Sequence, residues 1–191
     1  GHKKYDEVKY DGFYRRFKQE ENFPEMAGKD IRVYFNFETV ENEKINIKFA
    51  LSPVSSAGAL KNMEAEIPHW DFNKTKEETK EKWNKELSKI EVSSINKGDK
   101  INFYTAMYHT NLSPILYEDV DGQYRGLDQN IHTSEGFTNY TIFSLWDTYR
   151  ALHPLLNITQ PERNNDMIKS MLAHHDESVH NMLPIWSHYA N

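Results

Sequence analysis

Apolar and polar residues alternate through one long stretch near the start of the sequence. Between residues 29 and 51, apolar side chains occupy every second position on both sides of the polar segment "VENEK". These positions are Ile31, Val33, Phe35, Phe37, Ile45, Ile47, Phe49 and Leu51. A period of two is typical of strands with one buried face, so the pattern predicts an antiparallel β-hairpin. Two strands alone are only marginally stable.

The period changes from two to that of a helix after Pro53. "SSAGALKNMEAEI" predicts a helix that begins behind a serine cap and ends at Pro68. "DFNKTKEETKEKWNKELSKIEV" carries a narrow apolar stripe on a highly charged surface, which is typical of a connecting helix. "DKINFYTAMYHTNLSP" predicts a compact aromatic helix that stops before Pro114.

Residues 116–141 show several Gly and Asp residues and no helical period. We expect a long loop there, and loops of this length are often functional. Two helices are predicted to follow. The first, "TIFSLWDTYRALHPLL", has one continuous apolar face formed by Ile142, Leu145, Trp146, Tyr149, Leu152 and Leu156. The second, "TQPERNNDMIKSMLAHHDESV", starts with a predicted capping box of Thr159 and Glu162 and has Pro161 in its first turn.

The order of elements, strands first and helices afterwards, predicts an α+β chain in which a linker helix joins a β part to a separate α part. The 191 residues suffice for one ordinary domain or for pieces of two. The chain starts "GHKKYDEVKY" and ends "LPIWSHYAN", with neither an initiator Met nor a polar tail. We therefore expect a fragment of a longer protein.

Composition excludes several classes of function. The net charge of −6, without any basic block, is unlike that of nucleic-acid binders, so no nucleic-acid partner is expected. The absence of cysteine rules out disulfides and thiolate metal sites. No apolar run approaches the ~20 residues that a transmembrane helix needs, so no membrane span is expected.

Asp147 and Arg150 lie among the apolar residues of the predicted helix at 141–156. Three residues apart on a helix, they can form a local ion pair at the edge of a core. A functional interpretation stays open beside this one. The face of Trp146 can stack on a sugar ring while the adjacent Asp147 carboxylate accepts hydrogen bonds from sugar hydroxyls.

Metal sites and nucleotide sites have little support in the sequence. "DVDG" at residues 119–122 resembles the start of a calcium loop, but the further oxygen ligands and the closing Glu are missing. "AHHDESVH" could place Asp176 and His180 on one helix face, yet this spacing is also that of an ordinary surface pair and no H-E-x-x-H pattern occurs. Serine hydrolase elbows, phosphate loops and dinucleotide-binding turns are likewise absent from the sequence.

Several long motifs carry a family resemblance. "ALSPVSSAGALKNMEAEIPHWDFNK", "FYTAMYHTNLSP", "DVDGQYRG", "GFTNYTIFSLWDTYRALHPLL" and "QPERNNDMIKSMLAHHDESVHNMLPIW" closely resemble glycoside hydrolase family 92. The resemblance runs from about Lys29 to the last residue, and "FTNYTIFSLWDTYRALHPLL" is its most specific part. Members are mainly bacterial exo-acting α-mannosidases, many of them α-1,2-specific.

The resemblance implies a fold and its division into domains. Residues 1–55 would be the last strands of an N-terminal antiparallel β-sandwich, residues 56–98 a helical linker, and residues 99–191 the first helices of an (α/α)6 toroid. Helices cut off from later neighbours would expose apolar side chains such as Phe103, Met107 and Leu183, so self-association is expected.

The resemblance also implies a site. Family members invert the anomeric centre with the help of a calcium ion, and their Trp and Asp in the "WDTYR" segment face the mannose pocket. Trp146 and Asp147 are therefore the substrate-binding candidates, while Arg150 is expected to be structural. The family's catalytic acid, base and calcium ligands fall beyond residue 191, so no catalytic or metal-ligating residue is assigned, and the chain alone is expected to bind no calcium and to be inactive.

The resemblance further implies a mannose-containing glycan, such as N-glycan mannose, as the partner, and a periplasmic, cell-surface or secreted location. Two alternatives remain. A non-catalytic carbohydrate-binding or structural module would use Trp146, Asp147 and the loop from Asp119 to Arg125 as its contact surface. An unrelated helical interaction module would require a buried Trp146 and an Asp147 paired with Arg150.

Overall fold

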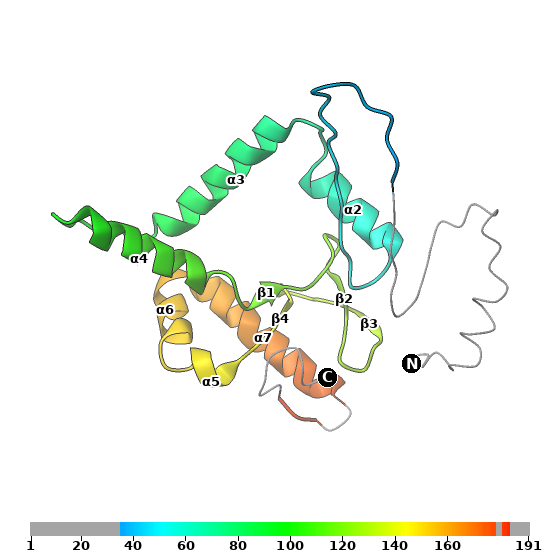
Figure 1. The fold of residues 1–191 in the computed structure, drawn as a ribbon. Coiled ribbons are helices and arrows are strands. Elements are labelled where there is room, and N and C mark those ends of the chain that lie inside the picture. The colour runs from blue at the N-terminus through cyan, green and yellow to red at the C-terminus, as the bar shows by residue number, and fades with distance from the viewer. Residues whose placement is uncertain (1–34, 179–180, 184–191) are drawn as a thin grey trace. The chain divides into compact units, whose positions relative to one another are not determined.

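The computed structural model describes residues 35–178 and 181–183 (Figure 1). The chain divides into two units, Gly1–Ile47 and Lys48–Asn191. In the described part of the first unit, residues 35–47, the backbone makes a turn at residues 41–42. Asn42 adopts a φ of 66°, and the Glu43 N–H donates to the Val40 carbonyl at 3.1 Å. The polar segment that separates the two predicted strands thus does contain a turn.

The strands of the predicted hairpin are not formed in residues 35–51, so this prediction is wrong for the described residues. Residues 29–34 lie outside them. The apolar side chains that should have made a buried face are exposed, with Phe35 and Ile47 both at 73% in the first unit and Phe49 at 80% in the second. Strands of this kind need partner strands and a covered face, and the residues described here supply neither.

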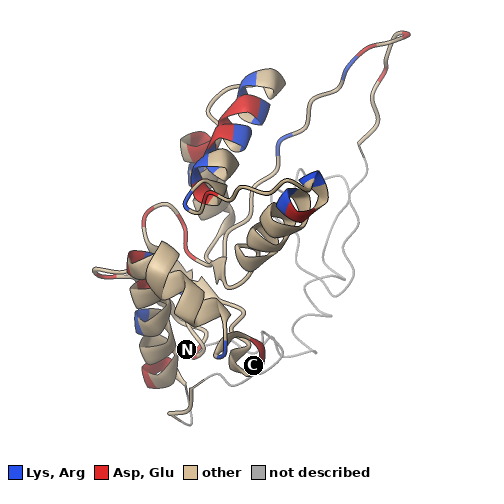
Figure 2. Ribbon diagram, turned by 90° about the vertical axis from the view of Figure 1, so that its left-hand side faces the viewer, with Lys and Arg blue, Asp and Glu red and all other residues tan. Residues whose placement is uncertain are grey.

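The next three helices follow the predicted pattern. α2 (Ser56–Glu66) begins behind Ser55, whose hydroxyl accepts from the Gly58 N–H, and it ends before Pro68. α3 (Phe72–Leu87) is capped by Asp71 and carries dense charge of both signs (Figure 2). α4 (Lys97–Thr110) is capped by Asn96 and packs on α3. One detail differs, because Met107 is 7% exposed and therefore buried instead of open to solvent.

Residues 116–141 are not a structureless loop. β1 (Ile115–Leu116) pairs antiparallel with β4 (Tyr140–Thr141), and β2 (Gln123–Arg125) pairs antiparallel with β3 (Ile131–Thr133). The register places Tyr124 opposite His132. Strands of two or three residues are too short to produce a visible alternation in sequence, because a recognisable strand pattern needs at least four.

The helix predicted at 141–156 is broken into two. α5 (Leu145–Thr148) makes a single turn, and α6 (Leu152–Thr159) follows after a turn at residues 149–151. Pro154 explains the break. A proline inside a continuous helix would clash with the carbonyl of Arg150, four residues earlier, whereas in the first turn of α6 its missing N–H has no partner to lose.

α7 (Pro161–Glu177) begins with Pro161 in its first turn, as predicted. The predicted capping box is wrong, since Gln160 occupies the N-cap and no side chain caps the helix. Thr159 is still part of α6, where its hydroxyl donates to the Leu155 carbonyl at 3.1 Å. The hydroxyl is therefore engaged in the preceding helix.

A small core holds the C-terminal part of the second unit together. Phe143, Leu156 and Met167 are each 2% exposed, and side chains of β4, α6 and α7 pack around them. Ser170, on α7, is fully buried and accepts a hydrogen bond from the Tyr140 N–H at 3.0 Å, which fixes β4 on the helix. The described chain thus combines helices with small antiparallel sheets, and the α+β prediction is confirmed at this level.

Candidate functional site

The two predicted substrate-binding residues lie on α5. Trp146 is 64% exposed and Asp147 is also exposed, on a single helical turn directly after the buried Phe143. Tyr149, one turn further on, is 55% exposed. An accessible indole, an accessible carboxylate and an accessible phenol therefore occur within four residues. This combination can stack on a sugar ring and bind its hydroxyls.

Asp147 is held by Ser144 and not by Arg150. The Ser144 hydroxyl donates to Asp147 Oδ2 at 2.5 Å, and the Asp147 N–H donates to the Ser144 carbonyl at 3.1 Å. Arg150 turns to Tyr149 instead, with Nε 2.6 Å from the phenol oxygen and the guanidinium 5.3 Å from the ring centroid. The predicted local ion pair between Asp147 and Arg150 is therefore not formed, and that prediction is wrong. Exposure of Trp146 also removes the basis for the helical interaction module.

The two ends of the loop from Asp119 to Arg125, which the binding-module alternative uses as a contact surface, are engaged in hydrogen bonds within the chain. Asp119 is 2% exposed; its oxygens accept from Ser52 Oγ at 2.6 Å and Asn62 Nδ2 at 2.7 Å. Arg125 donates to the carbonyls of Pro53 at 3.0 Å and of two further residues. Both ends of the loop thus fasten it to the chain around the start of α2, and Asp119 is unavailable to a sugar or a calcium ion.

A buried polar network joins the β2–β3 hairpin to the end of α7. The Tyr124 hydroxyl donates to Glu177 Oε1 at 2.5 Å, and His132 lies between Asp128, at 3.0 Å, and Glu177, at 3.9 Å. The Glu177 side chain is only 9% exposed, and its Oε2 is buried without a hydrogen-bond partner. Burial raises the pKa of Glu177 against the hydrogen bond from Tyr124 and the charge of His132, which both lower it, and burial together with the nearby Glu177 also raises the pKa of Tyr124.

The two histidines near the end of α7 make contacts within the protein. His174 is 5% exposed and packs edge-on against Phe143, and burial lowers the pKa of His174 to about 4. His175 contacts Asp176 at 2.9 Å, whereas His180 lies outside the described residues. Within residues 35–178 and 181–183, no group of three or more His, Cys, Asp or Glu side chains could hold a metal ion.

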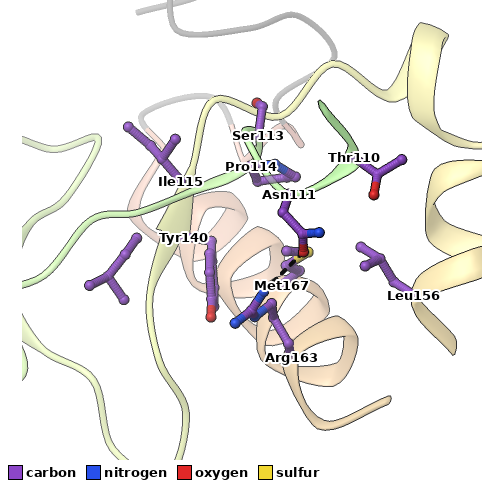
Figure 3. A pocket seen from close by; sticks show the side chains of 10 residues that line it. Thr110, Asn111, Ser113, Pro114, Ile115, Tyr140, Leu156, Arg163 and Met167 are labelled. Atoms are coloured by element: carbon purple, nitrogen blue, oxygen red, sulfur yellow. Dashed lines mark hydrogen bonds between the residues drawn. The ribbon is translucent and has the colours of Figure 1, made fainter. Parts of the chain in front are cut away.

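A pocket of about 350 Å³ lies where β1, β4, α6 and α7 meet the end of α4 (Figure 3). Tyr140 and Arg163 lie on one side of it, Leu156 on another, and Asn111 points across toward Arg163. Neither Trp146 nor Asp147 lines this pocket. The described chain thus contains two separate places that combine polar groups with apolar or aromatic surface.

Sequence reasoning missed three features of these sites. Ser144 was overlooked although it stands three residues before Asp147, a spacing typical of a helix start. Arg163 was overlooked because its pocket joins segments far apart in the chain, such as Asn111 and Leu156. Glu177 belongs to the segment "AHHDESVH" that was weighed as a metal site, but its contact with Tyr124 gave no signal, since the two residues lie 53 positions apart.

Comparison with known proteins gives a consistent result. The profile of the glycosyl hydrolase family 92 catalytic domain matches residues 58–191. A family GH92 alpha-mannosidase from Bacteroides thetaiotaomicron has a similar structure, with a TM-score of 0.69 and 53% identity over 73% of this chain and 19% of the other. Its complex with mannoimidazole matches equally well, at 53% identity and a TM-score of 0.69.

The GH92 family glycosyl hydrolase ccman5 is more distant, with 26% identity, a TM-score of 0.60, and coverage of 66% of this chain and 17% of the other. No curated protein matches the chain. The chain therefore spans about a fifth of the length of the solved relatives that it matches. With the profile match extending over residues 58–191 and 53% identity to a solved member, the chain belongs to glycoside hydrolase family 92.

Proposed function

We propose that these 191 residues are part of an exo-acting, inverting α-mannosidase that removes terminal mannose from glycans such as N-glycan mannose. The observation that carries this proposal is the exposed pair on α5. Trp146 is 64% exposed beside an Asp147 that Ser144 holds at 2.5 Å. The alpha-mannosidase activity named for the Bacteroides thetaiotaomicron relative supports the same substrate class.

Each residue of the pair has a defined task in this proposal. The indole of Trp146 stacks on the C–H face of the mannose ring, which excludes water from one side of the sugar. Asp147 accepts hydrogen bonds from mannose hydroxyls. The Ser144 hydroxyl already occupies Oδ2, so it fixes the carboxylate before the sugar arrives and lowers the entropy cost of binding.

The proposed domain arrangement is the one implied by the family resemblance. Residues 1–55 would complete a β-sandwich, residues 56–98 would form the linker and residues 99–191 would begin an (α/α)6 toroid. α2, α3 and α4 are consistent with a linker followed by toroid helices. Residues 35–55 contain no strand, so a sandwich would require further chain beside them.

The reaction needs groups that the proposal places outside these residues. Inverting hydrolysis uses an acid and a base carboxylate roughly 6.5–9.5 Å apart with a water molecule between them. The calcium of the family would bind and orient sugar hydroxyls. The described residues do not fit a calcium site, because Asp119 is already bound by Ser52 and Asn62 and the described chain offers no cluster of three ligands.

Substitution in the complete gene product tests the site. Trp146→Ala and Asp147→Asn should each lower kcat/KM for an α-linked mannobiose about 10- to 100-fold, because the first removes the stacking surface for the sugar and the second removes hydrogen bonds to a charged group, which are worth about 1.5–3 kcal/mol. Ser144→Ala should cost only about 2- to 10-fold, because Asp147 remains but is less well held. Arg150→Gln is the control and should leave kcat/KM nearly unchanged. Wild-type rates for the Trp146 and Asp147 variants would refute the site.

A second test separates catalysis from binding. The 191-residue chain assayed alone should release no mannose, whereas the complete gene product should do so in a calcium-dependent manner. Calcium-dependent release of mannose by the 191 residues would overturn the assignment of acid, base and calcium ligands to other parts of the protein. If the reading frame ends at residue 191, the alternative of a non-catalytic carbohydrate-binding module becomes the one to test, by titration with mannose.

The proposed setting follows from the substrate. Glycans with terminal mannose are met outside the cytoplasm, so we propose a periplasmic, cell-surface or secreted location. No helix within the described residues has the length and apolar character needed to cross a membrane.

A further inference from the structure

The pocket of Figure 3 has the size and the lining of a small-molecule site. Its volume of about 350 Å³ lies at the lower end of the range of ~300–1,000 Å³ that is typical of such sites. One wall is apolar and includes Pro114, Leu156 and Met167. The remaining lining brings together the polar side chains of Thr110, Asn111, Ser113, Tyr140 and Arg163. A ligand with both an apolar face and several polar groups would be complementary to it.

Arg163 is the cation of this pocket. Its Nη1 lies 3.5 Å from Asn111 Oδ1 and 3.9 Å from Glu86 Oε2, and its side chain is 35% exposed. These two contacts use the same nitrogen and both are long, and the guanidinium also interacts with the Tyr140 phenol by a side-chain hydrogen bond. A guanidinium has five N–H donors in a planar fork, so Arg163 retains donors for a further acceptor, and a carboxylate matches the geometry of this fork.

The charges around Arg163 do not neutralise it. Glu86 is shared, because Lys89 Nζ binds the same Oε2 at the much shorter distance of 2.7 Å. The charge of Asp166 helps to raise the pKa of Tyr140, and Asp166 Oδ1 lies 3.9 Å from Lys169 Nζ. The acidic contact of Arg163 is thus long and shared with Lys89, and a carboxylate of a ligand could bind the guanidinium more closely.

The carboxylate of Glu118 also raises the pKa of Tyr140 through its charge, but its hydrogen bonds are made with residues outside the pocket. It accepts hydrogen bonds from the Ser134 hydroxyl at 2.6 Å and from the Asn139 N–H at 2.8 Å. Burial raises the pKa of the Tyr140 phenol, so this group remains a hydrogen-bond donor at neutral pH.

Two hydroxyls in the lining can receive hydrogen bonds from a ligand. Thr110 donates to the Met107 carbonyl at 2.7 Å, and Ser113 donates to the Ile142 carbonyl at 3.2 Å. Their protons are committed, but their oxygens remain acceptors. The pocket thus offers a cationic fork, a phenol donor, hydroxyl acceptors and an apolar wall, which matches a small hydroxylated ring that bears one carboxylate.

We propose that this pocket is a second carbohydrate site, distinct from Trp146 and Asp147, that binds a uronic acid with its carboxylate on Arg163 and its ring against Leu156 and Met167. The site does not depend on hydrolysis of mannose. It would bring glycans with acidic residues to the protein independently of the α5 site.

Titration of the isotope-labelled 191-residue chain with glucuronate, followed by NMR chemical-shift changes, tests the proposal. Saturable shifts should appear at Asn111, Tyr140 and Arg163 and not at Trp146. Mannose should bind this pocket at least 10-fold more weakly, because it lacks the carboxylate, and acetate at least 10-fold more weakly, because it lacks the ring. Shifts confined to Trp146, absence of saturable binding, or equal affinities for glucuronate and acetate would overturn the proposal.

Two substitutions of one residue separate the forked geometry from the charge. Arg163→Gln should weaken glucuronate binding at least 10-fold, and Arg163→Lys should weaken it about 5-fold, since an ammonium group keeps the charge but loses the fork. Lys169→Gln, which removes a cation nearly two turns further along α7 that does not line the pocket, should change the affinity less than 2-fold. If Arg163→Gln fails to fold, Arg163→Lys decides, and unchanged affinity in that variant would refute carboxylate recognition by the fork.

Discussion

Replacing Gly58 by alanine should destabilise the protein, although alanine is the better helix former. A Cβ at Gly58 would lie 2.2 Å from Asp119 Oδ2 and 2.7 Å from Ser52 Oγ. To reach an ordinary contact distance of 3.4 Å, the carboxylate would have to move by 1.2 Å. Moving Asp119 would cost free energy, because it is 2% exposed and both of its carboxylate oxygens accept hydrogen bonds, one from Ser52 and one from Asn62.

The magnitude follows from the hydrogen bonds that this movement disrupts. A hydrogen bond to a charged group contributes about 1.5–3 kcal/mol, and at least one of the two would be lost. Alanine in place of glycine in a helix recovers roughly 0.5–1 kcal/mol. If one hydrogen bond is lost, the expected net loss is about 0.5–2.5 kcal/mol, which corresponds to a fall in Tm of roughly 1–10 °C for a chain of this size.

Urea and thermal unfolding followed by far-UV circular dichroism measure the effect. Gly98→Ala is a matched control, because Gly98 also lies in the first turn of a helix and donates its N–H to a cap, Asn96, yet an added Cβ meets only Asn96 Oδ1 at 3.2 Å. This control should be neutral or slightly stabilising. In an Asp119→Ser background, Gly58→Ala should cost less, because the obstructing carboxylate is gone. A Gly58→Ala protein as stable as the wild type would refute the described packing of α2 on Asp119.

Three further predictions concern pH and association. Burial lowers the pKa of His174 from 6.5 to about 4, so neutral His174 contributes its full stability above pH 6.5. This contribution, on the order of 3 kcal/mol, is lost as the pH falls toward 4. The variant His174→Gln should therefore show a smaller fall in Tm between pH 7 and pH 5 than the wild type. The pKa of Glu177 is raised above 4.5, so its contribution to stability is complete below that pH and is lost as the pH rises through the folded-state pKa. The Tm of Glu177→Gln relative to wild type should therefore be higher at pH 8 than at pH 4, and a constant difference over this range would contradict the raised pKa. Self-association through exposed helix faces is expected from Ile101 on α4, 57% exposed, and Leu172 on α7, 57% exposed; sedimentation velocity should show it at high concentration, and Ile101→Glu should reduce it.

The sequence predicted those elements whose signals are local. α2, α3 and α4 each have a helical period and a capping side chain next to the first turn, at Ser55, Asp71 and Asn96. The hairpin prediction failed at residues 35–51 because an alternating pattern shows only that one face of a strand is apolar. Such a strand forms only when other segments pair with it and bury that face. Trp146 and Asp147 could be named from the sequence, since a family motif contains them.

Contacts between distant residues could not be predicted. Asp119 looked like a calcium or sugar ligand in the segment "DVDG", but its actual partners, Ser52 and Asn62, lie 67 and 57 residues away. The segment "DVDG" would look the same in a calcium site and in a structural turn. Only the fold decides whether the carboxylate of Asp119 faces solvent or a buried amide. The Arg163 pocket is hidden in the same way, because its lining comes from α4, β1, β4, α6 and α7.

The exposure of Trp146 depends on the break between α5 and α6. In one continuous helix, Trp146 would share an apolar face with Leu152 and Leu156, and that face is the one that packs in the core, where Leu156 is 2% exposed. The interruption at residues 149–151, which Pro154 requires, uncouples the two turns. Leu156 can then remain in the core while Trp146 is 64% exposed. The proline that makes the helix prediction fail therefore also accounts for the exposure of Trp146.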